Sequence, residues 1–197
     1  MEVRRKITVE TEMFEVGDVI KFKLTNGEKV KAMAVRETSE GMLFIAVDCI
    51  GGEQPMFKNP GGMGSMELCY ENSDLRYYLK DELFPLFPEE IKSRMVGMRI
   101  GNGDNFDRIR IPTEKEIFGE NVYGQDEGKV KQFKGMKKRR NRISFDRSNG
   151  REDLQWYWLQ NRHEEYASLF AFVNDRGNAD CYDASYSNGV RPVFLLS

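Results

Sequence analysis

The cysteines and the single histidine carry the most reactive side chains of this sequence. Cys49, Cys69 and Cys181 are an odd number at wide, irregular spacing, which argues against a disulfide framework and a Cys-rich zinc site. His163 is the only histidine, so one chain cannot form a His-rich metal site, and its polar, glutamate-rich surroundings favour an exposed side chain over a catalytic base. We interpret the cysteines as buried apolar side chains in a reduced, intracellular setting or in a particle assembled inside a cell.

Two glycine-rich stretches and one acidic stretch are further candidates for binding phosphate or a cation. The stretches at 61–64 and 101–106 lack the Gly-Lys-Ser/Thr ending of a phosphate-binding loop and do not lie between an obvious strand and a helix start. Asp175, Asp180 and Asp183 have the oxygen ligands that a hard cation needs, but ordinary turn chemistry explains them more simply. We therefore predict no catalytic residue, no metal ligand and no cofactor.

A polar tract before the closing apolar run is the strongest candidate for a ligand-binding surface. Tyrosine offers a large contact area at low entropic cost and small polar residues adapt their hydrogen bonds, as in recognition loops. The same residue types dominate ordinary turns and hairpins, which is the simpler alternative. The candidate ligand-binding residues are Asn174, Asp175, Asn178, Asp180, Tyr182, Asp183, Tyr186 and Asn188, together with Ser185 and Ser187.

The strongest charge cluster is "KGMKKRRNR", residues 134–142. Such a run can neutralise phosphates and give salt-sensitive nucleic-acid binding. We favour the alternative of a solvated loop and expect no nucleic-acid partner, because the net charge of −2 gives no global field toward nucleic acid or an anionic membrane. The candidate nucleic-acid residues are Lys137, Lys138, Arg139, Arg140 and Arg142.

Residues 16–50 are predicted to form an antiparallel meander. Apolar residues alternate with Lys21 and Lys23, and Asn26-Gly27 is typical of a hairpin turn in which both central residues have positive φ. The third strand, 41–50, is apolar almost throughout, as expected of a strand that is covered on both faces.

Helices are predicted within residues 73–96. Asn72 or Ser73 caps the first helix, Pro85 ends it, and Pro88 begins a second short one.

The middle of the chain contains one more helix signal and a long polar segment. Ile109 and Ile111 alternate in a short strand, and Thr113 with Glu116 fits a capping box. Residues 124–150 are polar, basic and without periodicity, which indicates an exposed loop.

Residues 154–197 are predicted to form three strands, "LQWYWLQNR", "ASLFAFVNDRG" and "VRPVFLLS". Trp156 and Trp158 would face the same side of the first strand, with one or both in the core.

The closing strand follows a glycine, Gly189, that we interpret as a turn residue. We expect Arg191 to be held in a structural ion pair, and Pro192 to mark an edge, a bulge or a strand start because proline lacks a donor.

Strands and helices do not alternate as in βαβ units. The sequence therefore predicts one α+β domain over residues 1–197, with a small, mostly antiparallel sheet, two helices and long loops. No apolar run approaches the length of a membrane span, and the N-terminal 16 residues lack the apolar region of a secretory signal.

The motifs "VGDVIKF", "NSDLRYYLKDELF", "DRIRIPTEKE", "WYWLQNR" and "NGVRPVFLLS", in this order, resemble a family of uncharacterised domains of gut-associated Gram-positive bacteria and their phages. The closing strand is similar in turn to the strand that ends formylglycine-generating-enzyme-like domains and the variable proteins of diversity-generating retroelements. The resemblance implies a C-type-lectin-like fold. It also places the polar tract where the variable proteins carry their diversified residues.

The chain departs from these relatives at several positions. The family's Trp-Trp-Leu-Arg stands here as Tyr157 to Gln160, which loses the arginine, and Leu-Ser-x-x-Glu stands as 111–116. A formylglycine-generating oxidase needs paired cysteines near its C-terminal region, where this chain has only Cys181. Lectin-type calcium binding needs a third oxygen ligand where this chain has Met56.

The expected function is a non-enzymatic, lectin-like domain that binds a protein or a glycan through its C-terminal loops. We expect a location in the cytoplasm or in a phage particle, and no membrane partner. Two alternatives remain: an enzyme of the formylglycine-generating-like fold, and a nucleic-acid-associated protein that uses residues 134–142.

Overall fold

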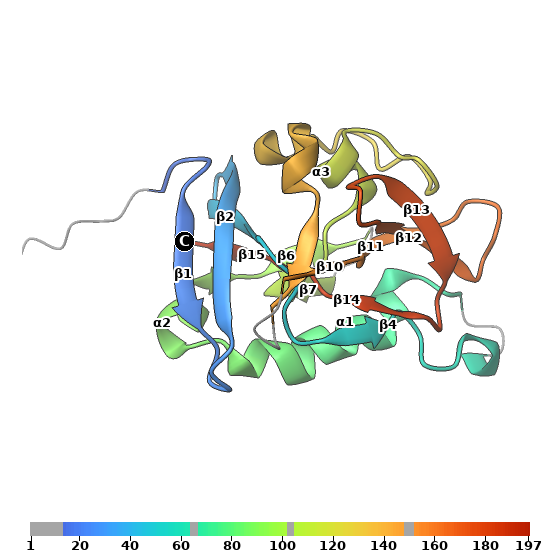
Figure 1. Cartoon of the computed structure of the whole chain (residues 1–197), viewed down its shortest axis with the longest axis horizontal. Coiled ribbons are helices and arrows are strands. Elements are labelled where there is room, and N and C mark those ends of the chain that lie inside the picture. The colour runs from blue at the N-terminus through green and yellow to red at the C-terminus, as the bar shows by residue number, and fades with distance from the viewer. Residues whose placement is uncertain (1–13, 64–66, 102–104, 148–151) are drawn as a thin grey trace, which may run out of the picture.

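The computed structural model describes residues 14–63, 67–101, 105–147 and 152–197. The fold is mixed α and β, with two larger sheets whose strands pair mostly antiparallel (Figure 1). Sheet A has the order β1-β2-β3-β15-β5, with β8 also paired to β15, and sheet B has the order β13-β12-β11-β14-β4. The predicted α+β class with mostly antiparallel sheets is therefore confirmed. Residues 1–13, 64–66, 102–104 and 148–151, on which parts of the predicted loops fall, lie outside the described residues.

The N-terminal meander is present as β1 (Val19–Lys23), β2 (Lys29–Thr38) and β3 (Gly41–Ala46). The predicted turn geometry is wrong, because only Gly27 has a positive φ, of 91°. The Gly27 amide donates to the Leu24 carbonyl at 2.9 Å, and the Leu24 amide donates to the Glu28 carbonyl at 2.9 Å. The turn thus needs the left-handed conformation at one residue and not at two.

The closing run forms β15 (Val193–Leu196), an interior strand of sheet A. It pairs antiparallel with β3, with β5 (Met95–Val96) and with β8 (Ile109–Arg110). Pro192 directly precedes β15, which confirms the predicted strand start. Every residue of β15 is buried, because one core packs on Phe194 and Leu196 and a second core packs on Val193 and Leu195.

Helical segments follow one another along the bottom of Figure 1. They are α1 (Asp74–Tyr78), the π-helical η3 (Leu79–Leu83), the 3-10 turn η4 (Phe84–Leu86) and α2 (Glu89–Lys92). Ser73 caps α1 by accepting from the Arg76 amide at 3.0 Å. The predicted helical range of 73–96 is too long, because β5 begins at Met95.

Sheet B contains two strands, β13 and β14, within the polar tract that was predicted to form loops. Its strands are β4 (Glu53–Pro55), β11 (Tyr157–Arg162), β12 (Leu169–Val173), β13 (Ala179–Asp183) and β14 (Ser187–Gly189). Strands β11 and β14 pair parallel, whereas the other neighbouring strands of sheet B pair antiparallel. Polar residues in β13 are compatible with a strand because β13 lies at the edge of the sheet.

Residues 124–147 are more structured than the predicted exposed loop. They contain the 3-10 turns η5 (Lys134–Lys137) and η6 (Arg139–Asn141), and β9 (Ser144–Asp146), which pairs with β10 (Asp153–Gln155). Phe133 and Met136 are fully buried. Two apolar anchors therefore hold a segment whose charged residues face solvent.

The remaining elements are short. They are η1 (Pro60–Met63), η2 (Tyr70–Asn72), β6 (Met98–Ile100), β7 (Asn105–Asp107) and α3 (Glu114–Phe118). The predicted capping box of Thr113 and Glu116 is present at α3, which ends at Gly119 with φ 86°. In the part of the chain that the structure describes, no helix has the length and apolar character needed to cross a membrane.

Candidate functional site

The first part of the polar tract forms the turn between β12 and β13. Asn174 Oδ1 accepts from the amides of Arg176 at 3.0 Å and Asn178 at 3.1 Å. The Gly177 amide donates to the Asn174 carbonyl at 2.9 Å, and Asp175 lies within the same turn. These contacts give Asn174 a structural role in the hairpin. This agrees with the simpler alternative, in which the polar residues are ordinary turn residues.

The second part of the tract lies at the other end of β13. A five-residue strand is roughly 17 Å long, and this length separates the two parts. Asp183 Oδ1 accepts from both the amide and the hydroxyl of Ser185, at 2.9 and 2.6 Å. Asp180 Oδ1 accepts from the Cys181 amide at 2.9 Å. The predicted ligand-binding residues thus form two groups and not one continuous site.

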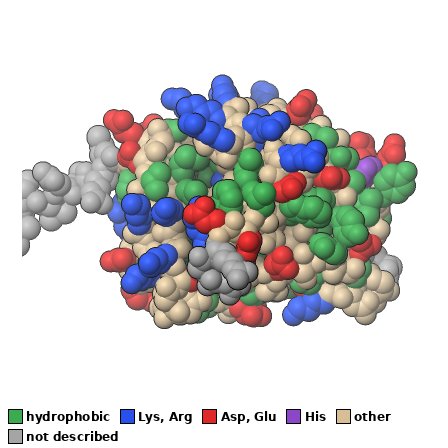
Figure 2. Space-filling model, in the orientation of Figure 1, with side chains coloured by type: hydrophobic (Ala, Val, Ile, Leu, Met, Phe, Trp, Pro, Cys, Tyr) green, Lys and Arg blue, Asp and Glu red, His purple; other side chains and the backbone are tan. Residues whose placement is uncertain are grey.

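Two exposed aromatic side chains belong to the second group, and a third, Trp156, lies over β12. The rings of Tyr182 and Tyr186 meet edge to face with centroids 4.7 Å apart, and they are 47% and 46% exposed. Trp156, 36% exposed, stacks on Phe172 at 5.1 Å, and the register places Phe172 opposite Asp180 in β13. We call Tyr182 and Tyr186, with Asp180 on the same face of β13 and Trp156 stacked over Phe172 of the adjacent strand, the aromatic surface. Figure 2 shows hydrophobic side chains at the surface over β12 to β14, on the right of the view.

Asn188 does not belong to this surface, contrary to the prediction. It is 1% exposed, because β14 is inserted between β11 and β4 and is covered. Its Nδ2 is buried and has no hydrogen-bond partner in the described part of the chain. Trp158, also predicted for the core, is fully buried and donates from Nε1 to the Gln54 carbonyl at 2.8 Å.

Arg191 is buried, but no ion pair holds it among the described residues, so the predicted ion pair is wrong. Its guanidinium donates to the carbonyl oxygens of Ala46 at 2.8 Å and Asn141 at 3.0 Å. It also donates to the Tyr157 hydroxyl at 3.0 Å and lies 5.0 Å from the Tyr157 ring centroid. Carbonyl oxygens and a ring face satisfy this cation in place of a carboxylate.

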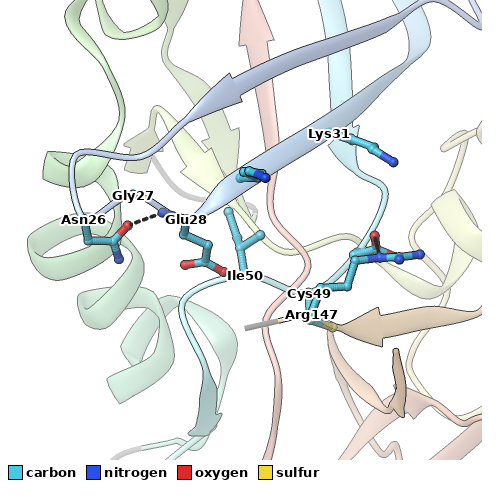
Figure 3. Close-up of a pocket in the computed structure, with 9 residues that line it drawn as sticks. Asn26, Gly27, Glu28, Lys31, Cys49, Ile50 and Arg147 are labelled. Carbon is cyan, nitrogen blue, oxygen red and sulfur yellow. Dashed lines mark hydrogen bonds and ion pairs between the residues drawn. The ribbon is translucent and has the colours of Figure 1, made fainter. Parts of the chain in front are cut away.

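A cleft of about 710 Å³ lies beside the β1–β2 hairpin (Figure 3). We call it the hairpin cleft. Its lining residues are Asn26, Gly27, Glu28, Lys29, Lys31, Asp48, Cys49, Ile50 and Arg147. The Glu28 carboxylate accepts from the Gly51 amide at 3.2 Å, and Arg147 pairs with Asp48 at 2.6 Å. Both acids are therefore occupied, whereas the lysines remain exposed.

The Cys49 thiol at the hairpin cleft is not a nucleophile at neutral pH. Its Sγ lies 3.1 Å from the Ser144 hydroxyl, and burial raises the pKa of the thiol to about 12. Burial also raises the pKa of Cys69 and of Cys181. All three cysteines are free, and nucleophilic chemistry needs the thiolate that these shifts suppress.

A second, polar cleft was not foreseen from the sequence. Two adjoining hollows of about 180 and 400 Å³ share Tyr70, Glu71, Gln125, Gln160 and Asn161. Gln160, which replaces the family's arginine, donates to the Ile111 carbonyl at 2.6 Å. Cys69 and His163, both singled out in the sequence, line the smaller hollow, and Thr113 and Glu116 of the capping box line the larger one.

The acids beside the polar cleft are engaged in structural contacts. Arg110 binds Glu116 through two hydrogen bonds of 2.6 and 2.7 Å, and both residues are buried. Glu114 accepts from the amides of Tyr123 at 3.0 Å and Gly124 at 2.9 Å, while burial raises its pKa. These contacts leave neither carboxylate placed as a general acid or base. Among the described residues, no group of His, Cys, Asp and Glu side chains is arranged to hold a metal ion.

The predicted nucleic-acid residues lie on η5 and η6 and beside them. Lys137, Lys138, Arg139 and Arg140 are exposed. Arg142 is half-buried and donates to the Met136 carbonyl at 2.8 Å, so it holds the segment together.

Three comparisons with known proteins bear on this chain. A family model described as "Domain of unknown function (DUF6273)" matches residues 56–197. A search of the curated proteins found no match, and neither did a search of the solved structures.

Proposed function

Since the chain belongs to the DUF6273 family, a domain of unknown function, we propose a function from its surfaces: it is a non-enzymatic recognition domain that binds a protein partner. The observation that carries the proposal is the aromatic surface at the edge of sheet B, where the rings of Tyr182 and Tyr186 contact each other in solvent. The surface falls within the part of the chain that the family model matches.

The rings of this surface are held in place before any partner arrives. Trp156 stacks on the buried Phe172, and Tyr182 lies on a strand paired along its length with β12. Fixed aromatic side chains lose little entropy on binding, and Trp and Tyr are enriched among the residues that dominate interface energies. The clefts described above are lined by other residues, so the rings offer a platform to a macromolecule and not a pocket to a small ligand.

The charges beside the rings indicate the chemistry of the partner. Asp180 lies two residues before Tyr182 on the same face of β13, and its side chain is exposed. The Asp180 carboxylate accepts from the Cys181 amide, so this backbone donor at the edge of β13 is already bonded within the strand. We therefore propose recognition through side chains, by a partner whose contacting segment is basic, and not by addition of a strand to the sheet.

The double substitution Tyr182→Ser/Tyr186→Ser tests this proposal. Purified wild-type and variant chains are immobilised and incubated with lysate of the source cell, and the retained proteins are quantified by mass spectrometry. The matched control is Tyr77→Ser/Tyr166→Ser, because Tyr77 and Tyr166 are 51% and 58% exposed and lie elsewhere. We expect a specific set of retained proteins to fall at least tenfold in the first variant only.

Equal retention by the wild type and both variants would overturn the proposal. Thermal unfolding of each variant checks that the fold survives, since exposed tyrosines contribute little to the core. A retained set that is lost in the control variant as well would also count against the aromatic surface.

We also propose that the fold is C-type-lectin-like and that the domain works in the cytoplasm or in a phage particle. Two features support the fold proposal: β15 inserts between β3 and the β5 and β8 strands, and the polar tract forms the excursion that precedes it. An experimental structure tests it by superposition on C-type-lectin-like domains, and failure of β11 to β15 to superpose would reject it.

A further inference from the structure

Four lysines form a ladder on the outer face of the β1–β2 hairpin. The register pairs Lys21 with Lys31 and Lys23 with Lys29, and the next pair on this face is Val19 with Met33. All four lysines are exposed, while Phe22, between two of them, is buried on the opposite face. Successive pairs lie roughly 6.7 Å apart along the strands.

Like charges directly opposite each other destabilise a sheet. Across the described ranges, none of the four lysines forms an ion pair that would offset this repulsion. The hairpin therefore holds positive charge that nothing described in this chain neutralises. A bound anion would relieve the repulsion.

The ladder continues into the basic segment that lies more than a hundred residues later in the chain. A Cβ atom on Gly135 of η5 would lie 2.8 Å from Met33 Cε, so η5 sits directly against the last residue of the ladder's face. We call the combined set the basic surface: Lys21, Lys23, Lys29, Lys31, Lys134, Lys137, Lys138, Arg139 and Arg140. Figure 2 shows one group of Lys and Arg side chains at the left of the view and another at its top, with hydrophobic side chains between them.

The basic surface is hollowed where the hairpin cleft opens. Lys29, Lys31 and Arg147 all line this cleft, and Figure 3 labels Lys31 and Arg147 there. The acids of the cleft are engaged, Asp48 by Arg147 and Glu28 by the Gly51 amide. Lys29 and Lys31 are therefore the cations of the cleft without an ion pair among the described residues, since Arg147 is paired with Asp48 and with Glu152.

Contrary to the expectation from the net charge, we infer that the basic surface, which joins the lysine ladder to residues 134–140, binds nucleic acid through its phosphates. A row of unpaired lysines that leads into a concave site fits a rod-like polyanion, whereas a bilayer presents a flat surface. Among the described residues, no aromatic side chain lines the hairpin cleft, so the contacts position a phosphate backbone and read no bases. This surface is distinct from the aromatic surface, and the inference does not depend on the proposed protein partner.

Fluorescence anisotropy tests the inference with a labelled single strand of about 20 nucleotides and a duplex of the same sequence. For the oligonucleotide that binds, we expect a Kd of roughly 10⁻⁶ to 10⁻⁴ M near physiological salt. We expect this affinity to fall steeply as the salt concentration rises. The arm that binds more tightly distinguishes single-stranded from duplex nucleic acid.

The variant Lys21→Gln/Lys31→Gln removes the central pair of the ladder. We expect the slope of log K against log salt to fall by about 1.4 on the single strand or about 1.8 on the duplex, for two lost phosphate contacts. The variant should unfold at the same temperature as the wild type or higher, because a repulsive pair is gone, so weaker binding cannot reflect unfolding. The matched control is Lys58→Gln/Lys80→Gln, two exposed lysines outside the basic surface.

Three results would overturn the inference. They are no binding of either oligonucleotide at low salt, an unchanged salt slope in Lys21→Gln/Lys31→Gln, or an equal loss in the control variant. Sedimentation with phosphatidylserine-containing vesicles serves as the competing assay. Binding to vesicles without binding to oligonucleotides would assign the surface to a membrane.

Discussion

Arg191 explains why the closing motif contains an arginine. Its guanidinium reaches the Ala46 carbonyl of sheet A, the Asn141 carbonyl of η6 and the Tyr157 hydroxyl of sheet B. A planar group with five donors can make these contacts at once, and an ammonium cannot. One side chain therefore joins both sheets to the basic segment.

We predict that Arg191→Lys destabilises the chain by about 3 kcal/mol, because buried carbonyl oxygens lose their donors while a buried charge remains. Urea unfolding measures the loss. Trypsin should also cut faster within residues 137–142, since η6 loses its anchor. The control is Arg176→Lys, at an exposed turn position. An unchanged urea midpoint for Arg191→Lys would contradict this role.

At the scale of elements, Gly189 serves close packing and not a turn, contrary to the prediction. It lies in β14 and its φ is not positive. A Cβ atom there would lie 2.6 Å from Cys49 Sγ and 2.8 Å from the Trp156 carbonyl oxygen. Because a backbone atom blocks the position, β14 can lie beside β11 only with glycine here.

We predict that Gly189→Ala costs about 1–3 kcal/mol of the free energy of unfolding, through overpacking between β14 and β11. Gly61→Ala is the control, because the nearest atom to its Cβ would be 4.0 Å away. Chemical denaturation of both variants checks the difference. A denaturation midpoint of Gly189→Ala equal to that of the wild type would contradict the prediction, because β14 and β11 would then accommodate the added Cβ atom without cost.

Elements with strong local signals were predictable. The capping box at Thr113 and the apolar third strand, predicted at 41–50 and observed at 41–46, each depend on residues close together in the chain. The strands β13 and β14 were missed because their polar residues are tolerated by position in a sheet, at its edge or between two strands. Position in a sheet depends on partners elsewhere in the chain.

At the scale of the whole molecule, buried acids with raised pKa values make stability sensitive to alkali. Burial raises the pKa of Cys49 to about 12 and of Tyr78 to about 12, from ordinary values of 9.0 and 10.0. Burial also raises the pKa of Tyr157. Above pH 9 the folded chain therefore binds more protons than the unfolded chain, so the free energy of unfolding falls as pH rises.

We predict that Cys49→Ala flattens this dependence. The thiol's contribution is fully present below pH 9.0 and is lost as pH rises toward about 12. One proton corresponds to about 1.4 kcal/mol per pH unit in that window. Urea midpoints measured from pH 8 to pH 10.5 check the slope against wild type (about one proton difference at most). Parallel curves for the two proteins would contradict the prediction.

The sequence alone determined the hairpin of β1 and β2, the helix caps, the existence of the closing strand and the antiparallel class, because these follow from periodicity and from turn and cap residues a few positions apart. Only the tertiary structure divided the polar tract, buried Asn188 and gave Arg191 carbonyl partners in place of an acid. It also placed Lys31 on the same surface as Lys134. These outcomes depend on contacts between segments far apart in the chain, which no local pattern of residues encodes.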